Sequence, residues 1–148
     1  MSRSNSLYLN KVIIDKYRIN IIDKALKVLK PFEDKFDSIA FRGMSGATIA
    51  PILAHLLHKN LIICRKNKKE CHSKIKVEQP LTYKKYLIVD DFVYTGDTIK
   101  NIIKDIDCNL KLFGLYLYDS RGRERKRDVE NLFYLKFNKG LFLYGESK

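Results

Sequence analysis

The chain has 148 residues and a mass of 17.4 kDa, the size of one domain with its own buried core. Hydrophobic residues make up 45% and charged residues 31%, a composition that excludes a disordered chain. No apolar run reaches the roughly 18 residues of a membrane span, and the N-terminus has no signal-peptide core, so we expect a cytoplasmic protein. The net charge of +12 favours an anionic partner, either a polyphosphate ligand or a nucleic acid.

Helices and buried strands are expected to alternate along the chain. Apolar residues at helical spacing cover residues 21–29, 49–57 and 99–106, and short continuous apolar runs cover residues 38–41, 61–64, 86–89 and 112–118. This alternation predicts an α/β fold, in which a mainly parallel sheet has helices on both faces and residues 1–148 form a single domain. Two further apolar stretches, 132–137 and 141–144, flank an Asn-Lys-Gly turn and predict a small C-terminal hairpin.

Positive charge is concentrated in two segments. Residues 65–85 lie between two expected strands without clear periodicity, and a loop of this length in a compact domain is usually a lid or a binding loop. The second basic segment, 121–127, lies in the tail, and its role stays open. The three cysteines, Cys64, Cys71 and Cys108, follow no metal-ligand spacing, so we interpret them as reduced thiols and expect no zinc.

The stretch YLIVDDFVYTGDTI, residues 86–99, places two adjacent acids directly after a buried strand. Like charges are costly to keep ionised there, which suggests that Asp90 and Asp91 hold a ligand. In open α/β sheets ligands bind beyond the carboxyl ends of the strands. The turn that follows opens a helix, and its amides and hydroxyls are suited to a phosphate. Acids beside a phosphate site fit a phosphorylated ribose; the alternative is that Thr95 or Asp97 only caps the helix.

The same stretch resembles the 5-phosphoribosyl pyrophosphate (PRPP) motif of the type I phosphoribosyltransferases. Four apolar residues, two acids, two apolar residues, one variable position and Thr-Gly-x-Thr follow one another in the family's strand-turn-helix setting. The resemblance implies that Asp90 and Asp91 bind the 2- and 3-hydroxyls of the ribose. It implies that the 5-phosphate is bound by the turn formed by Thr95, Gly96, Asp97 and Thr98.

Two upstream segments resemble the same family. In SIAFRGMSGAT, Arg42 and Gly43 match the Arg-Gly element of the pyrophosphate loop, and the family suggests a cis peptide bond at Phe41-Arg42. The segment LIICRKNKKECHSK is similar to the strand that leads into the flexible loop of the orotate enzymes, with one residue more before the histidine. The resemblance therefore implies pyrophosphate contacts from four residues of this loop: Arg65, Lys66, Lys69 and His72.

The resemblance implies a phosphoribosyltransferase that uses PRPP, Mg²⁺ and a nucleobase, and we expect a homodimer. Asp90, Asp91, Arg42 and Lys66 would be the catalytic residues. Mg²⁺ would be held by PRPP itself, with Asp90 and Asp91 contacting it through water and no direct protein ligand. Tyr94 stands where the 6-oxopurine enzymes carry an acid, which disfavours those bases.

The acceptor base is otherwise not identified by the sequence. Tyr118, Asp119 and Arg121, at the start of the tail, are candidates for base contacts. Two alternatives stay open. One is a regulator of the same fold that binds PRPP, a nucleotide or, less favoured, a nucleic acid without catalysis. The other is a hydrolase that acts on nucleotides.

Overall fold

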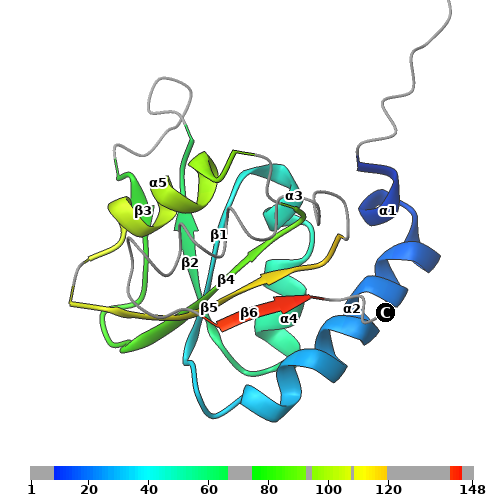
Figure 1. Ribbon diagram of the computed structural model, residues 1–148, viewed down its shortest axis with the longest axis horizontal. Helices are drawn as coiled ribbons and strands as arrows, with labels where there is room; N and C mark the ends of the chain where they lie inside the picture. The colour runs from blue at the N-terminus through cyan, green and yellow to red at the C-terminus, as the bar shows by residue number, and fades with distance from the viewer. Residues whose placement is uncertain (1–8, 67–74, 93–94, 108, 120–140, 145–148) are drawn as a thin grey trace, which may run out of the picture.

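The computed structural model describes residues 9–66, 75–92, 95–107, 109–119 and 141–144. They form one six-stranded sheet in the order β3-β2-β1-β4-β5-β6, in which every neighbouring pair is parallel except β2 with β3 (Figure 1). The strands are β1 (Ser38–Arg42), β2 (Asn60–Cys64), β3 (Val77–Glu78), β4 (Lys85–Asp90), β5 (Lys111–Leu117) and β6 (Leu141–Tyr144). The mainly parallel α/β sheet expected from the sequence is confirmed.

Helices cover both faces of this sheet (Figure 1). They are α1 (Asn10–Ile13), α2 (Asp15–Leu29), the 3-10 helix η2 (Lys30–Phe32), α3 (Gly43–Ala47), α4 (Ala50–Leu56) and α5 (Asp97–Asp105). Successive residues of a strand point to opposite faces. Leu87 and Val89 of β4 pack with α2 and α4, whereas Tyr86 and Ile88 pack with α5. Burial on both faces explains why the sequence shows continuous apolar runs and not alternation.

The order of strands creates a switch point between β1 and β4. The chain runs outward from β1 to β2 and then returns to place β4 on the other side of β1. Connections on opposite sides leave a crevice at the carboxyl ends of these two strands, where α/β proteins bind ligands. These ends are Arg42 and Asp90. The topology therefore brings together two segments that lie 48 positions apart in the sequence.

The structure corrects what the sequence predicted for residues 65–85 and for the C-terminal hairpin, and part of each segment lies outside the described residues. Residues 65–85 are not wholly irregular, because Val77–Glu78 pairs with β2 as β3; residues 67–74 lie outside the described part of the chain. Residues 141–144 do not form a separate addition but join the main sheet as β6, parallel to β5. The other half of the expected hairpin, 132–137, is not described.

The expected cis bond at Phe41-Arg42 is wrong, since no peptide bond among the described residues is cis. Arg42 keeps an extended backbone and pairs with Cys64, so β1 continues through it and the chain turns only at Gly43, with φ of 82°.

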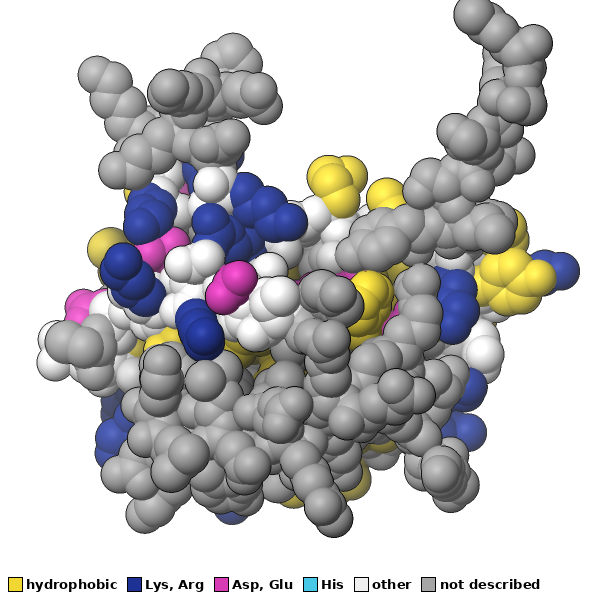
Figure 2. Space-filling view, turned by 45° about the horizontal axis from the view of Figure 1, so that its top comes forward, with side chains coloured by type: hydrophobic (Ala, Val, Ile, Leu, Met, Phe, Trp, Pro, Cys, Tyr) yellow, Lys and Arg dark blue, Asp and Glu magenta, His cyan; other side chains and the backbone are white. Residues whose placement is uncertain are grey.

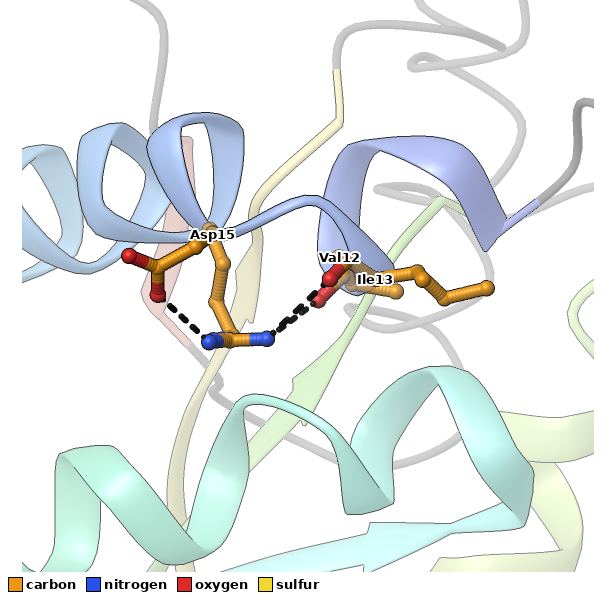
Figure 3. A network of polar contacts seen from close by, with 4 residues as sticks. Val12, Ile13 and Asp15 are labelled. Carbon is orange, nitrogen blue, oxygen red and sulfur yellow. Dashed lines mark hydrogen bonds and ion pairs between the residues drawn. The ribbon is translucent and has the colours of Figure 1, made fainter.

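A polar network joins α1 to α2 at a sharp corner (Figure 3). The guanidinium of Arg18 donates to the carbonyl oxygens of Val12 at 3.2 Å and Ile13 at 3.3 Å, and it pairs with Asp15 at 2.6 Å. These bonds satisfy carbonyls at the end of α1, which a helix terminus leaves open. They hold α1 over the same face of the sheet as α2. Among the described helices, none combines the length and apolar character that crossing a membrane requires.

Candidate functional site

A pocket of about 150 Å³ lies at the switch point, next to the carboxyl ends of β1 and β4. Its walls come from three parts of the sequence: residues 42–45, residue 66 and residues 90–99. The lining residues are Arg42, Ser45, Lys66, Asp90, Asp91, Phe92, Thr95, Gly96, Asp97, Thr98 and Ile99. The structure thus brings most of the residues singled out in the sequence into one cavity.

Asp90 and Asp91 are buried at the tip of β4, with exposed fractions of 6% and 5%. The Oδ1 atom of Asp90 accepts hydrogen bonds from the backbone N–H of Asp91 at 2.9 Å and from the hydroxyl of Ser45 at 3.3 Å. Burial, and then the negative charge of Asp91, raise the pKa of the Asp90 carboxyl toward neutrality. The Oδ1 atom of Asp91 accepts a hydrogen bond from the backbone N–H of Phe92 at 2.7 Å. Sugar hydroxyls are suitable further donors for a pair of buried carboxyl groups.

We expect Asp90→Asn to stabilise the fold increasingly as pH rises from about 4 toward neutrality. In this range the unfolded chain loses the Asp90 proton while the folded protein retains it, so the stability of the wild type falls with pH. Asparagine has no proton to lose, and its Oδ1 can accept the same two hydrogen bonds. Thermal unfolding at a series of pH values measures the effect, with about 2–4 °C for each kcal/mol.

The control for this experiment is Asp23→Asn, which changes an exposed acid on α2. A surface change of this kind is expected to alter stability by no more than about 0.5 kcal/mol. A stability difference between wild type and Asp90→Asn that does not change with pH would contradict the raised pKa.

The 95–98 turn forms the opposite wall and leads into α5. Gly96 precedes the helix with φ of 85°, a left-handed conformation that glycine adopts without a steric penalty. The Thr95 hydroxyl donates to the Asp97 carboxylate at 3.0 Å and accepts a hydrogen bond from the backbone N–H of Asp97 at 3.3 Å. Thr95 therefore caps the first amide of α5, as the alternative from the sequence expected, whereas Gly96 at the N-cap position has no side chain that could bond the next amides. Those next amides lie at the positive end of the helix dipole, where an anion can bind.

Arg42, Gly43 and Lys66 meet at the end of β1. The Nε and Nη1 atoms of Arg42 are buried and have no hydrogen-bond partner among the described residues. Unpaired buried donors are costly, so an anion in the pocket would complete their hydrogen bonds. A Cβ at position 43 would lie 2.8 Å from Lys66 Cε and 2.9 Å from Nζ. Glycine at this position therefore allows the lysine to lie against the loop beside Arg42.

Ser45 is a site residue whose role the sequence did not indicate. The sequence shows no neighbouring residue with which Ser45 would act. In the structure Ser45 lies on α3, and its hydroxyl donates a hydrogen bond to Asp90, 45 positions later in the sequence. Only its place directly after the Arg-Gly-Met segment could have suggested a role at the pocket.

Tyr118 and Asp119 support the two acids from the end of β5. The backbone N–H of Tyr118 donates to the carbonyl of Asp90 at 3.2 Å, and that of Asp119 donates to the carbonyl of Asp91 at 2.9 Å. The Tyr118 hydroxyl also donates to the Ser45 carbonyl at 2.8 Å. Tyr118 therefore joins three parts of the site: β4, β5 and α3.

We expect Tyr118→Phe to lower the free energy of unfolding by about 1 kcal/mol, because it removes one largely buried hydrogen bond. The Ser45 carbonyl keeps a second donor, the hydroxyl of Thr48 at 2.8 Å, which limits the loss. Urea unfolding measures the change, with Tyr17→Phe as control because Tyr17 is 45% exposed. Equal effects of the two substitutions would show that the Ser45 bond contributes nothing.

Of the four expected loop contacts, Lys66 lines this pocket. Arg65 does not line it, and its guanidinium pairs with Glu78 of β3. Lys69 and His72 lie outside the described residues. Cys64 is a free, buried thiol, and burial raises its pKa to about 12, which fits a space-filling role. Cys71, Cys108, Tyr94 and Arg121 also lie outside the described part.

The pocket suits a hydrated metal better than one held by protein alone. Among the described residues, no group of three or more His, Cys, Asp or Glu side chains could hold a metal ion. Asp90 and Asp91 offer oxygen atoms, which Mg²⁺ prefers, and this ion usually keeps several waters and shares its ligands with a substrate phosphate. The acids therefore fit an ion that arrives with a phosphate ligand.

Two basic residues, Arg42 and Lys66, line the pocket together with the acids. Figure 2 shows that Lys and Arg side chains gather on the side of the molecule that carries β3 and α5, with single acidic side chains between them. A positively charged surface raises the local concentration of an anionic ligand.

A scan against family models and a search of curated proteins both found no match. Solved structures do match. Orotate phosphoribosyltransferase of Aeropyrum pernix is 18% identical with a TM-score of 0.65, over 93% of this chain and 75% of that one. UMP synthase of Leishmania donovani is 21% identical with a TM-score of 0.70, over 90% of this chain and 28% of that longer one.

Adenine phosphoribosyltransferase of Saccharomyces cerevisiae is 20% identical with a TM-score of 0.56, over 74% of this chain and 71% of that one. The described residues therefore have the fold of the phosphoribosyltransferases, as the motif in residues 86–99 implied.

Proposed function

We propose that this chain, which has the phosphoribosyltransferase fold, transfers the phosphoribosyl group of PRPP to a nucleobase and releases pyrophosphate. One observation carries the proposal: a single pocket holds paired acids, the N-terminus of α5 and a buried arginine with unpaired donors. A sugar hydroxyl, a terminal phosphate and a pyrophosphate are the three groups that such walls would bind. PRPP carries all three groups in one molecule.

The ligand would lie with each of its parts against one wall. Asp90 and Asp91 would accept hydrogen bonds from the 2- and 3-hydroxyls of the ribose. The 5-phosphate would lie in the 95–98 turn and accept hydrogen bonds from amides in the first turn of α5. Arg42 and Lys66 would contact the pyrophosphate at the end of β1. These positions are expectations from the resemblance that the pocket geometry supports.

The reaction needs positioning and charge stabilisation more than a protein nucleophile. A ring nitrogen of the base forms a bond to C1 as the bond from C1 to the pyrophosphate oxygen breaks. Pyrophosphate leaves with the bonding electron pair, and the proton of the ring nitrogen passes to solvent. Negative charge therefore grows on the leaving group, where the donors of Arg42 would stabilise it. Donors of this kind are worth about 3–4 kcal/mol each.

Mg²⁺ bound by the pyrophosphate would neutralise part of its charge. Asp90 and Asp91 are the protein groups that would hold it, through water. Neither the acceptor nor a homodimer follows from this pocket; both stay predictions.

The experiment that tests the proposal is pyrophosphate release from PRPP and Mg²⁺ with a panel of bases. Release that depends on one base supports the transferase. PRPP binding without release, for every base, would overturn it in favour of the regulator that keeps the fold. Release of free base and ribose 5-phosphate from a nucleotide, with water as acceptor and without PRPP, would favour the hydrolase.

A further inference from the structure

A second and larger pocket, of about 310 Å³, lies between α2 and the end of β5. Its lining is Lys11 of α1, Tyr17, Asn20, Ile21 and Lys24 of α2, and Tyr116 and Tyr118 at the end of β5. Its volume lies within the range of about 300–1,000 Å³ that is typical of small-molecule sites. None of these residues contributes to the first pocket.

The two pockets are neighbours at the end of the sheet where β1, β4 and β5 terminate. Tyr118 lines the second pocket, and its hydroxyl is bonded at 2.8 Å to the backbone of Ser45, which lines the first. Lys11 lines the second pocket, and its ammonium is 3.8 Å from Asp119, whose backbone N–H is bonded to Asp91. A molecule at the strand-end mouth of the second pocket would therefore lie beside the ribose position of the first.

The chemistry of the lining selects a flat, negatively charged molecule. Three tyrosine rings and Ile21 provide apolar walls that fit a planar ring. The two lysines provide positive charge, and no acid lines this pocket among the described residues. The ammonium of Lys11 is shared with Asp119, but Lys24 has no ion pair with any described residue. Asn20 adds an amide that can both donate and accept hydrogen bonds.

We infer that this pocket binds the acceptor base, and that the base is a planar heterocycle that carries a carboxylate. The inference rests on the proposed function, because it names the acceptor of that reaction. A neutral purine would leave the charge of Lys24 without a partner, whereas a carboxylate would form a charge-assisted hydrogen bond with it. The aromatic walls would hold the ring with its reactive nitrogen toward the first pocket.

The test is calorimetric titration of the full chain with orotate and with uracil, which has the same ring without the carboxylate. We expect wild type to bind orotate at least tenfold more tightly than uracil, since hydrogen bonds to charged groups reach this size. Lys24→Gln is expected to lose about tenfold in orotate affinity and to bind uracil almost unchanged, because it removes only the charge that meets the carboxylate.

The matched control is Lys27→Gln, which removes the same charge from an exposed position of α2 outside the pocket. It is expected to change orotate affinity by less than about twofold, since exposed charges are screened by salt. Equal affinity for orotate and uracil, or equal effects of Lys24→Gln and Lys27→Gln, would overturn the inference.

The titration contains no PRPP, so its result is independent of transfer. Pyrophosphate release with adenine in a protein that does not bind orotate would uphold the proposed function and overturn the inference. Orotate binding that depends on Lys24, in a protein that releases no pyrophosphate with any base, would overturn both the transfer and the acceptor role. Release that occurs with orotate and is weakened by Lys24→Gln supports both.

Discussion

Replacing Asp90 and Asp91 together by asparagine is expected to lower kcat/KM for PRPP by about 10³-fold. In an assay above neutral pH, where Asp90 is also ionised, each carboxylate would accept a hydrogen bond from a ribose hydroxyl. Hydrogen bonds to charged groups are worth about 1.5–3 kcal/mol each. Asparagine has nearly the same shape as aspartate, and its side-chain oxygen can still accept a hydrogen bond. The loss in kcat/KM therefore measures the removal of negative charge and not the creation of a cavity. Pyrophosphate release at varied PRPP concentration measures the effect.

The loss of activity is expected together with a gain in stability. The two acids are buried side by side, so neutral side chains remove a repulsion that the folded state carries. A less active but more heat-stable variant is the pattern of a site whose residues are strained for function. An inactive variant that also melts lower than wild type would indicate a structural role for the acids. A fully active variant would remove the basis of the proposed function.

Replacing Arg42 by glutamine is expected to lower kcat by about 10²–10³-fold. The reason is that its donors would meet charge that develops on the leaving pyrophosphate, more in the transition state than in bound PRPP. KM for PRPP is expected to change less than kcat, and steady-state kinetics separates the two constants. Arg42→Lys is expected to recover only part of the rate, because an ammonium cannot reproduce the planar set of guanidinium donors.

The matched control is Arg18→Gln, which removes the same group from the corner between α1 and α2 (Figure 3). Arg18 lies outside the pocket, so its loss is expected to lower stability by about 1 kcal/mol and to leave kcat unchanged. A higher KM for PRPP with unchanged kcat in Arg42→Gln would assign Arg42 to PRPP binding and not to the chemical step.

The sequence alone predicted strands β1, β2, β4 and β5, helices α2, α4 and α5, and the turn of the site, but not β3. Continuous apolar runs such as residues 86–89 can be buried on two faces only between helix layers, so local pattern was enough for the α/β class. The order of residues in 86–99 also determined that acids end a strand and that a glycine turn opens a helix. These features depend on contacts within a few residues, which a sequence displays directly.

Only the tertiary structure decided what reaches the pocket from elsewhere. Ser45 meets Asp90, and Tyr118 meets Ser45, across 45 and 73 positions, distances over which no local pattern carries information. The partner of Arg65 depended on the pairing of β3 with β2, and residues 141–144 joined the sheet because β5 offered an open edge. The second pocket has the same origin, since the packing of α2 on β5 brings Lys24 and Tyr118 to one cavity.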